Sequence, residues 1–466
     1  MSEKAEKPPR AGFWGRNLSL FKRQTLASVN NAWQEIAGTA RAIRGTIDPD
    51  LPKTDTERVL QQMQACLSAK GGEVSARQNT VALGSTYLAL SEKGRVRFLQ
   101  LLSGHFAANR ALVRNRMEDI ERAQSDLELT QAENALRDAL EAPRVKILRQ
   151  FNSLPQGVKF LVDMREDLLE LREKHPELAG LEMDLRRLLS SWFDIGLLDL
   201  REITWQSPAS LLEKLIAYEA VHEIRSWTDL KNRLDSDRRC FAFFHYKMPE
   251  EPLIFVEIAL VNDIAANIHM LLDESQPATN PEKADTAIFY SISNAQQGLS
   301  GISFGNFLIK RVVDTLSKDL KNIRTFATLS PIPNFRRWLD GAMENKTLVS
   351  EADKKLLAHL HEADWHQKTA AAEALKPLLM RLCAHYLTSE KRKNNAYDPV
   401  AHFHLTNGAV MERLNWLADT SPKGLKQSAG MMVNYHYKRD EIDRNHELYT
   451  SGKAFAVGRQ IRQLYQ

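Results

Sequence analysis

The period of the hydrophobic residues changes near Trp192, and this change constrains the fold more than any other feature of the sequence. Over residues 24–190 apolar side chains recur at the spacing of amphipathic helices. After Trp192, runs rich in β-branched and aromatic residues lie between helical stretches. A length of 466 residues also favours two domains over one. We therefore predict an α+β chain, with a helical bundle over residues 1–195 and a mixed α/β domain over residues 196–466.

Two apolar stripes support the helical half, and prolines divide it into several helices. Pro143, Pro155 and Pro176 each remove a backbone donor and restrict the preceding residue, so we expect helices to break there. Charged residues such as Lys159 and Asp163 form the expected solvated face. Core packing or a subunit interface explains the stripes better than a cofactor site, and we assign this half no chemistry. The stripes are Leu112, Val113, Met117, Ile120 and Leu127, and Val158, Leu161, Val162, Leu168 and Leu169.

The second half contains several strand-like runs. The first two, Cys240–Tyr246 and Leu253–Val261, are separated by MPEEP, which predicts a strand, a turn and a second strand. A helix predicted over residues 304–320 lies between two further runs and completes a β-loop-α-β unit. Asn407-Gly408 predicts a β-hairpin, because this dipeptide suits tight hairpin turns. The runs beside it are Ala401–Leu405 and Val410–Trp416, and the other runs are Ala287–Ile292, Thr325–Leu329 and Met431–Tyr437.

A glycine-rich segment opens the helix of the β-loop-α-β unit. Gly298, Gly301 and Gly305 follow its first strand and precede the helix. Glycines let a backbone approach a ligand closely, and the unpaired N–H groups of a helix N-terminus attract an anion such as a pyrophosphate. A tight turn without a ligand is an equal alternative. The nearest analogue is the pyrophosphate loop of GNAT acyltransferases, which bind coenzyme A at this topological position.

Ser330 and His404 are the candidate catalytic residues. Ser330 precedes Pro331, which suits the first position of a helix, so we expect its hydroxyl where a strand gives way to a helix N-terminus. His404 lies between Phe403 and Leu405, and in a strand it would face away from both. Taken singly, such a serine is more often a helix N-cap, and such a histidine is more often a hydrogen-bonded core residue.

Four separated segments resemble the malonyl-CoA decarboxylase family in sequence, order and spacing. They are YSISNAQQGLSGISFGNFLIKRVV, TLSPIPNFRRWL, FHLTNGAVMERLNWLAD and GMMVNYHY. The resemblance covers most of the chain and implies a helical domain used in assembly, followed by a GNAT-like catalytic domain that binds acyl-CoA. It further implies conversion of malonyl-CoA to acetyl-CoA and CO2 through a thioester enolate, without metal, biotin or nucleotide. Homo-oligomers such as tetramers, assembled through the helical half, are also implied.

The same resemblance assigns roles to individual residues. Ser330 corresponds to the family's catalytic serine and His404 to its catalytic histidine. Ser291 and Tyr437 correspond to a further active-site serine and tyrosine. Animal members carry a glutamate where this chain has Ser303, so we expect Ser303 only to line the site. The acyl-CoA loop corresponds to Ser300, Gly301, Ile302, Ser303, Phe304, Gly305 and Asn306.

Charge and cysteine content limit the partners and the compartment. Lysine and arginine total 63 against 59 acidic residues, a balance that predicts neither a nucleic-acid nor a membrane partner. The 3 cysteines are far apart and form no Cys-x-x-Cys pair, which fits a reducing compartment. The N-terminal residues lack the apolar core of a secretory signal, and no apolar run is long enough to span a membrane. We therefore predict a cytoplasmic protein.

Three other functions fit parts of the sequence. A GNAT-type acyl-CoA transferase shares the architecture but needs an amine-accepting channel, and no sequence feature indicates one. A non-catalytic interaction protein built on the helical half is the second alternative. A metal hydrolase is the third, because histidines and acids gather at residues 359–366. However, His359 and His361 cannot share a helix face, and His-Glu-x-x-His is absent from the sequence.

Overall fold

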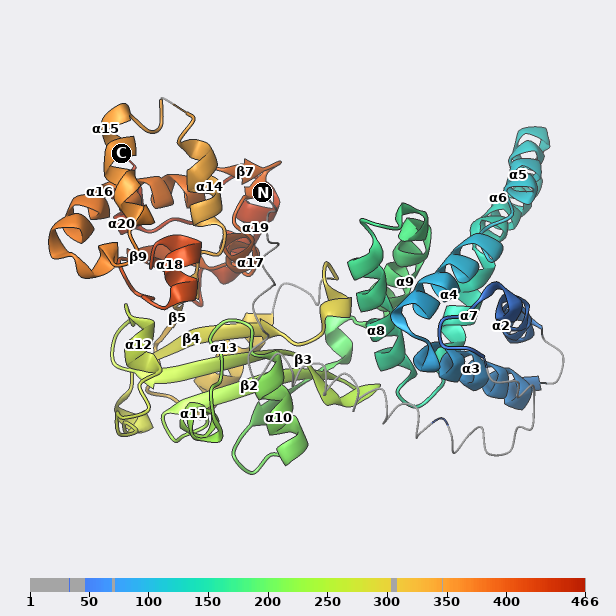
Figure 1. Cartoon of the computed structure of the whole chain (residues 1–466), viewed down its shortest axis with the longest axis horizontal. Helices are drawn as coiled ribbons and strands as arrows, with labels where there is room; N and C mark the ends of the chain where they lie inside the picture. The colour runs from blue at the N-terminus through green and yellow to red at the C-terminus, as the bar shows by residue number, and fades with distance from the viewer. Residues whose placement is uncertain (1–32, 34–46, 69–71, 303–307, 346, 466) are drawn as a thin grey trace, which may run out of the picture. The chain divides into compact units, whose positions relative to one another are not determined.

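The protein forms two compact units in the computed structural model (Figure 1). The structure describes Trp33 and residues 47–68, 72–302, 308–345 and 347–465. The first unit comprises residues 1–198 with segments 245–251 and 296–303, and the second comprises residues 199–244, 252–295 and 304–466. The predicted α+β order, a helical region followed by a mixed α/β region, is confirmed.

The described part of the first unit is built mainly of helices, and the three predicted breaks are confirmed. Pro143 is the first residue of α7, where its missing N–H is one of the donors that a helix leaves unpaired. Residues 152–156 separate α7 from α8, and Pro176 begins a short 3-10 helix. The helices are α2 (Lys53–Leu67), α3 (Gly72–Ala89), α4 (Glu92–His105), α5 (Arg110–Arg122), α6 (Asp126–Leu140), α7 (Pro143–Phe151), α8 (Gly157–Leu171), η1 (Pro176–Leu178), α9 (Ala179–Trp192) and η2 (Ile195–Leu197).

Helix α8 buries most of its residues, and one prediction about it is wrong. Val158, Leu161 and Leu168 are buried, as their stripe predicts. Lys159 was expected on the solvated face, but it is buried and its Nζ forms an ion pair with Asp163. A buried ammonium group is tolerated here because the carboxylate one turn away compensates its charge.

The other predicted stripe does not reach the core of its own chain. Helices α5 and α6 pack against each other as a hairpin, and none of the residues of α5 is buried. Leu112, Met117 and Leu127 are 38%, 53% and 69% exposed. Of the two explanations offered for this stripe, core packing is therefore wrong within the chain, and an interface with another chain stays a prediction.

The second unit is organised around a mixed sheet. Among the described residues the strands follow the order β1-β2-β3-β4-β5-β10-β6, and β9 also pairs with β10. β4 and β5 are parallel, with Thr286 opposite Thr325 and Phe289 opposite Thr328. The strands are β1 (Leu198–Ile203), β2 (Arg238–His245), β3 (Met248–Val261), β4 (Thr286–Asn294), β5 (Thr325–Thr328), β6 (Ser330–Pro331), β9 (Val410–Asn415) and β10 (Met432–His436). A separate pair is formed by β7 (Lys391–Arg392) and β8 (Asn395–Ala396).

The strand runs predicted at 287–292, 325–329 and 431–437 are confirmed, but the turn predicted at MPEEP is wrong. β3 already begins at Met248, so MPEEP is part of the strand and only Tyr246 and Lys247 separate β2 from β3. Proline in this segment is compatible with a strand near a hairpin end, where a ladder hydrogen bond is not required of every residue.

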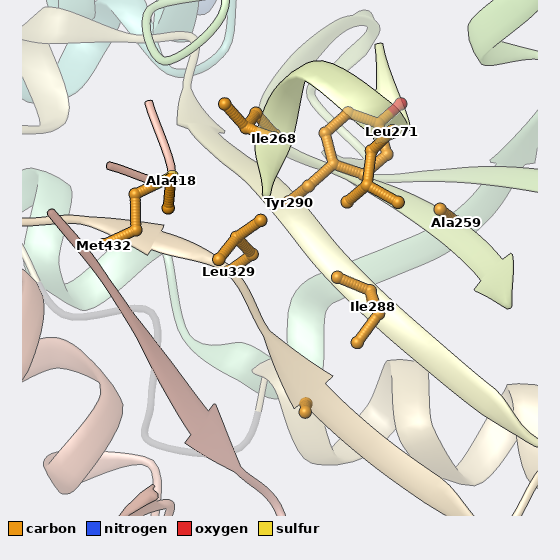
Figure 2. Close-up of a cluster of buried hydrophobic side chains, with 9 residues drawn as sticks. Ala259, Ile268, Leu271, Ile288, Tyr290, Leu329, Ala418 and Met432 are labelled. Carbon is orange, nitrogen blue, oxygen red and sulfur yellow. The ribbon is translucent and has the colours of Figure 1, made fainter. Parts of the chain in front are cut away.

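One face of the sheet carries an apolar cluster built on β4, β5 and β10. Ile288, Tyr290, Leu329 and Met432 meet there beneath α12 (Ile268–Leu271), as Figure 2 shows. Because successive strand residues point to opposite faces, Thr328 and Ser330 project away from this cluster. The alternation therefore directs hydroxyl groups from this part of the sheet to one face.

The β-loop-α-β unit is confirmed in its described part. The helix α13 (Leu308–Asp319) connects β4 to β5 and buries Leu308, Val312 and Leu316 on one face. Its predicted first residues, 304–307, lie outside the described part of the chain.

The predicted hairpin around Asn407-Gly408 is wrong, because the segment before it is a helix. α17 (Pro399–Thr406) starts after Asp398, whose side chain accepts the N–H groups of Val400 and Ala401. It ends at Asn407 and Gly408, and Gly408 has the positive φ of 79° that terminates many helices. Asp-Pro often starts a helix and Asn-Gly often ends one, although both dipeptides also occur in turns. The hairpin interpretation overlooked the helix start at Asp398-Pro399. His404 consequently lies on a helix and not on a strand.

Further helices complete the second unit, and those after β6 gather beside the C-terminal strands in Figure 1. Those before β5, besides α12 and α13, are α10 (Ala209–Tyr218), α11 (Trp227–Arg233) and η3 (Pro281–Lys283). The short helix η4 (Gln297–Leu299) also precedes β5 but belongs to the first unit. Those after β6, besides α17, are α14 (Phe335–Ala342), α15 (Glu351–Leu357), η5 (Ala358–His361), η6 (Trp365–Gln367), α16 (Thr369–Thr388), α18 (Pro422–Ser428), α19 (Ile442–Thr450) and α20 (Arg459–Gln463).

Candidate active site

Ser330 lies on a strand, and the expected helix N-terminus beside it is wrong. Ser330 is paired with Val433 of β10 in the short strand β6, and Pro331 pairs with Met432. Helix α14 begins only at Phe335, and its N-cap residue is Asn334. The segment continues the direction of β5 after Leu329, so pairing with β10 holds Ser330 extended. Ser330 is therefore not the N-cap of α14, which starts further along the chain.

The structure brings Ser330, His404 and Tyr437 together in one hydrogen-bonded chain. Ser330 Oγ lies 3.0 Å from His404 Nε2, although 74 residues separate them in sequence. His404 Nδ1 lies 2.7 Å from the hydroxyl of Tyr437. All three side chains are buried, with exposed fractions of 6%, 2% and 1%. Both ring nitrogens of His404 are thus engaged, which fixes the orientation of the ring.

Two further residues hold this chain, and neither was predicted from the sequence. Thr328 Oγ1 lies 2.8 Å from Ser330 Oγ and accepts the main-chain N–H of Tyr435 at 3.1 Å. The ring of Tyr435 stacks on His404, with 4.4 Å between centroids and 22° between planes. The sequence did carry a signal for Thr328, because residues two apart in a strand share a face with Ser330. The same spacing relates Tyr435 to Tyr437 in the strand predicted over residues 431–437.

Burial controls the charge of the histidine. Desolvation lowers the pKa of His404 to about 3, because the imidazolium form loses its hydration inside the protein. Desolvation also raises the pKa of Tyr437 well above its usual range. In the free protein near neutral pH, both groups are therefore uncharged, and His404 carries one N–H.

A neutral imidazole allows the hydrogen-bonded chain two arrangements. In the first, Tyr437 donates to Nδ1, and Nε2–H donates to Ser330. In the second, Ser330 donates to Nε2, and Nδ1–H donates to Tyr437. Each arrangement satisfies both observed contacts of the ring. The chain can therefore move a proton in either direction by exchanging one arrangement for the other.

Ser291 lies on β4 and is bound to a carboxylate that the sequence did not indicate. Its hydroxyl lies 2.8 Å from each oxygen of Glu219, and Ser293 Oγ donates to the same carboxylate at 3.0 Å. The main-chain N–H groups of Val221 and His222 also donate to Glu219. Because the single proton of Ser291 points to Glu219, its oxygen presents lone pairs and no donor in this arrangement.

The strands that carry Ser291 and Ser330 part after their last shared hydrogen bond. The parallel ladder ends at Phe289 and Thr328, and the N–H of Leu329 donates to the carbonyl of Phe289. Beyond this point β4 continues beside β3 as far as Asn294, whereas β6 pairs with β10. Ser291 and Ser330 thus lie on two strands that no longer bond to each other.

Arginines of the same unit hold the glycine-rich segment that leads into the described part of the predicted acyl-CoA loop, residues 300–302. Arg165 donates to the carbonyl of Gly298 at 2.5 Å, and Arg186 donates to that of Gly301 at 2.9 Å. A Cβ at Gly298 would lie 1.8 Å from the carbonyl oxygen of Val162, so this glycine is required by packing against α8. Ser300 and Ile302 belong to this described part, whereas Ser303, Phe304, Gly305 and Asn306 lie outside it.

Neither a metal-binding cluster nor a helix suited to span a membrane occurs in residues 47–68, 72–302, 308–345 and 347–465. Within these ranges no group of three or more His, Cys, Asp or Glu side chains is arranged to hold a metal ion. None of the helices found there has the length and apolar character needed to cross a membrane.

Comparisons with known proteins agree with the resemblance. The family model described as the malonyl-CoA decarboxylase C-terminal domain matches residues 196–466, and that of the N-terminal domain matches residues 106–193. The chain is 42% identical over 360 residues to the mitochondrial malonyl-CoA decarboxylase of Anser anser anser, which covers 72% of this chain and 71% of that protein. It is 40% identical over 363 residues to that of Rattus norvegicus, covering 72% and 74%.

Solved structures give the same result. The crystal structure of malonyl-CoA decarboxylase from Rhodopseudomonas palustris is 40% identical in sequence and has a TM-score of 0.84, covering 88% of this chain and 99% of that one. The crystal structure of the Agrobacterium vitis protein is 41% identical with a TM-score of 0.82, covering 88% and 100%. The family match over more than half of the chain and these full-length relatives show that the chain belongs to the malonyl-CoA decarboxylase family, a family of carboxy-lyases.

Proposed function

We propose that this protein converts malonyl-CoA to acetyl-CoA and CO2, and that Ser330 and His404 carry the reaction. The observation that supports this most is the buried hydrogen-bonded chain from Ser330 through His404 to Tyr437. It lies at the end of a β4-loop-α13-β5 unit, the part of a GNAT-like domain in which the sequence predicts acyl-CoA binding. Family membership supports malonyl-CoA as the substrate.

The reaction needs a stabilised enolate and one proton. The bond between the carboxylate and the α-carbon breaks, CO2 leaves, and the electron pair moves into the thioester carbonyl to form an enolate. The α-carbon then takes a proton and acetyl-CoA is formed, so each turnover consumes one proton. Enolate stabilisation by one oriented donor contributes about 3 kcal/mol, and a positioned proton donor contributes roughly two to four decades of rate.

The side chains divide these tasks in the following way. Ser330 bonds the malonyl head group, and His404 orients the Ser330 hydroxyl. The neutral His404 passes a proton from Nε2 towards the enolate while Nδ1 takes one from Tyr437, so no buried imidazolium has to persist. Tyr437 then regains one proton from solvent, and this is the proton that each turnover consumes. Ser291 contacts the head group beside Glu219 once its hydroxyl turns, and residues 300–306 line the acyl-CoA path.

Product analysis with purified protein tests the reaction. Incubation with malonyl-CoA alone should release CO2 and acetyl-CoA, whereas a GNAT-type transferase would release neither without an acceptor. We expect His404→Ala to lower kcat by at least about two decades, while CoA still binds as in the wild type. Binding is measured by isothermal titration with CoA. An equal loss of CoA binding in His404→Ala would contradict the assigned role.

The assembly, the domain roles and the compartment are further parts of the proposal. Residues 1–195 serve assembly and residues 196–466 carry the chemistry, in which case the exposed apolar side chains of α5 and α6 meet another copy of the chain. The homo-oligomer is a tetramer in the simplest form of this proposal. The charge and cysteine content favour a cytoplasmic protein, although the vertebrate relatives are named mitochondrial.

A further inference from the structure

Thr328 is a buried threonine that the proposed reaction does not yet use. It is the last residue of β5, and its side chain is 0% exposed. Its Oγ1 lies 2.8 Å from Ser330 Oγ and accepts the N–H of Tyr435 at 3.1 Å. The tyrosine that donates this N–H also stacks its ring on His404. Thr328 is thus tied to the same short piece of β10 that supports the histidine.

The Ser330 hydroxyl has one proton and two neighbours that can accept it. Thr328 Oγ1 lies at 2.8 Å and His404 Nε2 at 3.0 Å. A serine hydroxyl with a single partner can leave it by a rotation about χ1 to another staggered position. Here the two partners, Thr328 and His404, both contact Tyr435 of β10. Together they hold Ser330 Oγ in the one rotamer that lets it bond to both. Loss of either partner would therefore remove one hydrogen bond and also let Ser330 Oγ rotate away from the remaining partner.

We infer that Thr328 is a positioning residue for Ser330: its hydroxyl keeps Ser330 Oγ directed at His404 Nε2, and it affects the reaction only through Ser330. The rate measurements for this inference rest on the proposed decarboxylation, whereas the hydrogen-bond geometry does not. A purely structural role is the alternative, in which Thr328 only satisfies the buried N–H of Tyr435. That role predicts a loss of stability without a specific loss of rate.

Three variants separate the two roles by kinetics. Thr328→Val keeps the shape of the side chain and removes the hydroxyl, and we expect kcat to fall about tenfold while KM changes less than about twofold. Thr328→Ser keeps the hydroxyl and should recover most of the rate. Thr286→Val is the matched control, because Thr286 is also a buried threonine, on β4, and its hydroxyl donates to Asp285 at 2.7 Å. It should lower the melting temperature and leave kcat unchanged.

A double-mutant cycle tests whether Thr328 acts through Ser330. In a Ser330→Ala background, Thr328→Val should lower the residual kcat by less than about twofold. A tenfold drop in that background as well would overturn the inference. So would a wild-type kcat in folded Thr328→Val.

A measurement without substrate keeps the inference testable if the protein does not decarboxylate malonyl-CoA. The ¹⁵N resonances of the His404 ring report which nitrogen carries the proton. In Thr328→Val the Ser330 proton has only Nε2 to bind, so the ring should shift towards the tautomer protonated at Nδ1. Unchanged His404 resonances would overturn the inference. Absence of CO2 release from the wild-type protein would instead overturn the proposed function alone.

Discussion

His404 is a neutral residue in a buried place, and this distinguishes it from a histidine that works as an imidazolium. Its nitrogens contact Ser330 and Tyr437, and within the described residues no carboxylate forms a hydrogen bond with its ring. Without an anion to stabilise the charged form, desolvation dominates and lowers the pKa of His404 to about 3. A ring of this kind is suited to passing a proton on, because it gives one at one nitrogen as it accepts one at the other.

This neutrality predicts how His404 titrates. In the free protein its ring resonances should not titrate between about pH 5 and pH 8, whereas the histidines of the unfolded chain titrate near 6.5. Two-dimensional NMR of the ring nitrogens checks this. Between pH 6.5 and 3 the His404 ring is protonated in the unfolded chain but neutral in the folded protein. The free energy of unfolding should therefore fall progressively as the pH falls through that window. Titration of His404 near pH 6.5 in the folded protein would contradict the desolvated site.

Helix α17 shows how a short element determines the site at the scale of secondary structure. It has only 8 residues, so its position depends on its two ends. Asp398 caps the first turn, and burial raises the pKa of this carboxyl to about 6. At the other end, a Cβ on Gly408 would lie 2.2 Å from the carbonyl oxygen of Ile442. The helix therefore holds His404 opposite Ser330 only if Gly408 stays a glycine.

Gly408→Ala should accordingly destabilise the protein and reduce activity together. The positive φ alone costs about 1–2 kcal/mol for alanine, and the contact with the backbone of Ile442 adds to it. Gly341→Ala is the matched control, since Gly341 lies in α14 and an added Cβ meets no atom within 4 Å there. That change should be neutral or stabilising by up to about 1 kcal/mol. Thermal melts of both variants decide the matter, and equal melting temperatures would contradict the role given to Gly408.

At the scale of the whole molecule, the exposed apolar side chains of the first unit are the feature that most needs an explanation. Apolar residues on helix surfaces are usually directed inward, yet Met117 and Leu127 are 53% and 69% exposed on the α5–α6 hairpin. Leu140 at the end of α6 is 56% exposed as well. A hairpin of this kind gains stability if a second copy of the chain covers it.

Charge placed on the hairpin should therefore dissociate the assembly. We expect the wild-type protein to elute as a homo-oligomer, and Met117→Glu combined with Leu127→Glu to shift it to a smaller species. Val74→Glu is the control, because Val74 is 70% exposed on α3 and lies outside the hairpin. Light scattering coupled to size exclusion gives the masses. A wild-type monomer, or the same shift in Val74→Glu, would contradict an interface on this hairpin.

Local sequence patterns were sufficient for the order of the elements and for most of their types. The helical spacing before residue 192, the breaks at Pro143 and Pro176 and the β-loop-α-β unit all depend on neighbouring residues, so they could be predicted. Two predictions were wrong because the same short sequence pattern occurs in two kinds of structure. Asn407-Gly408 is a hairpin turn and also a helix end, and MPEEP reads as a turn although it starts β3.

The residues proposed to react also came from the sequence, through a family resemblance, and the comparisons show the family itself. What only the tertiary structure decided is which groups these residues meet. Ser330 contacts His404 across 74 residues and Thr328 across two, and Tyr437 reaches the far side of the imidazole. Hydrogen bonds between distant residues, and the desolvation that keeps His404 neutral, depend on how the strands and α17 pack, and no local pattern encodes that packing.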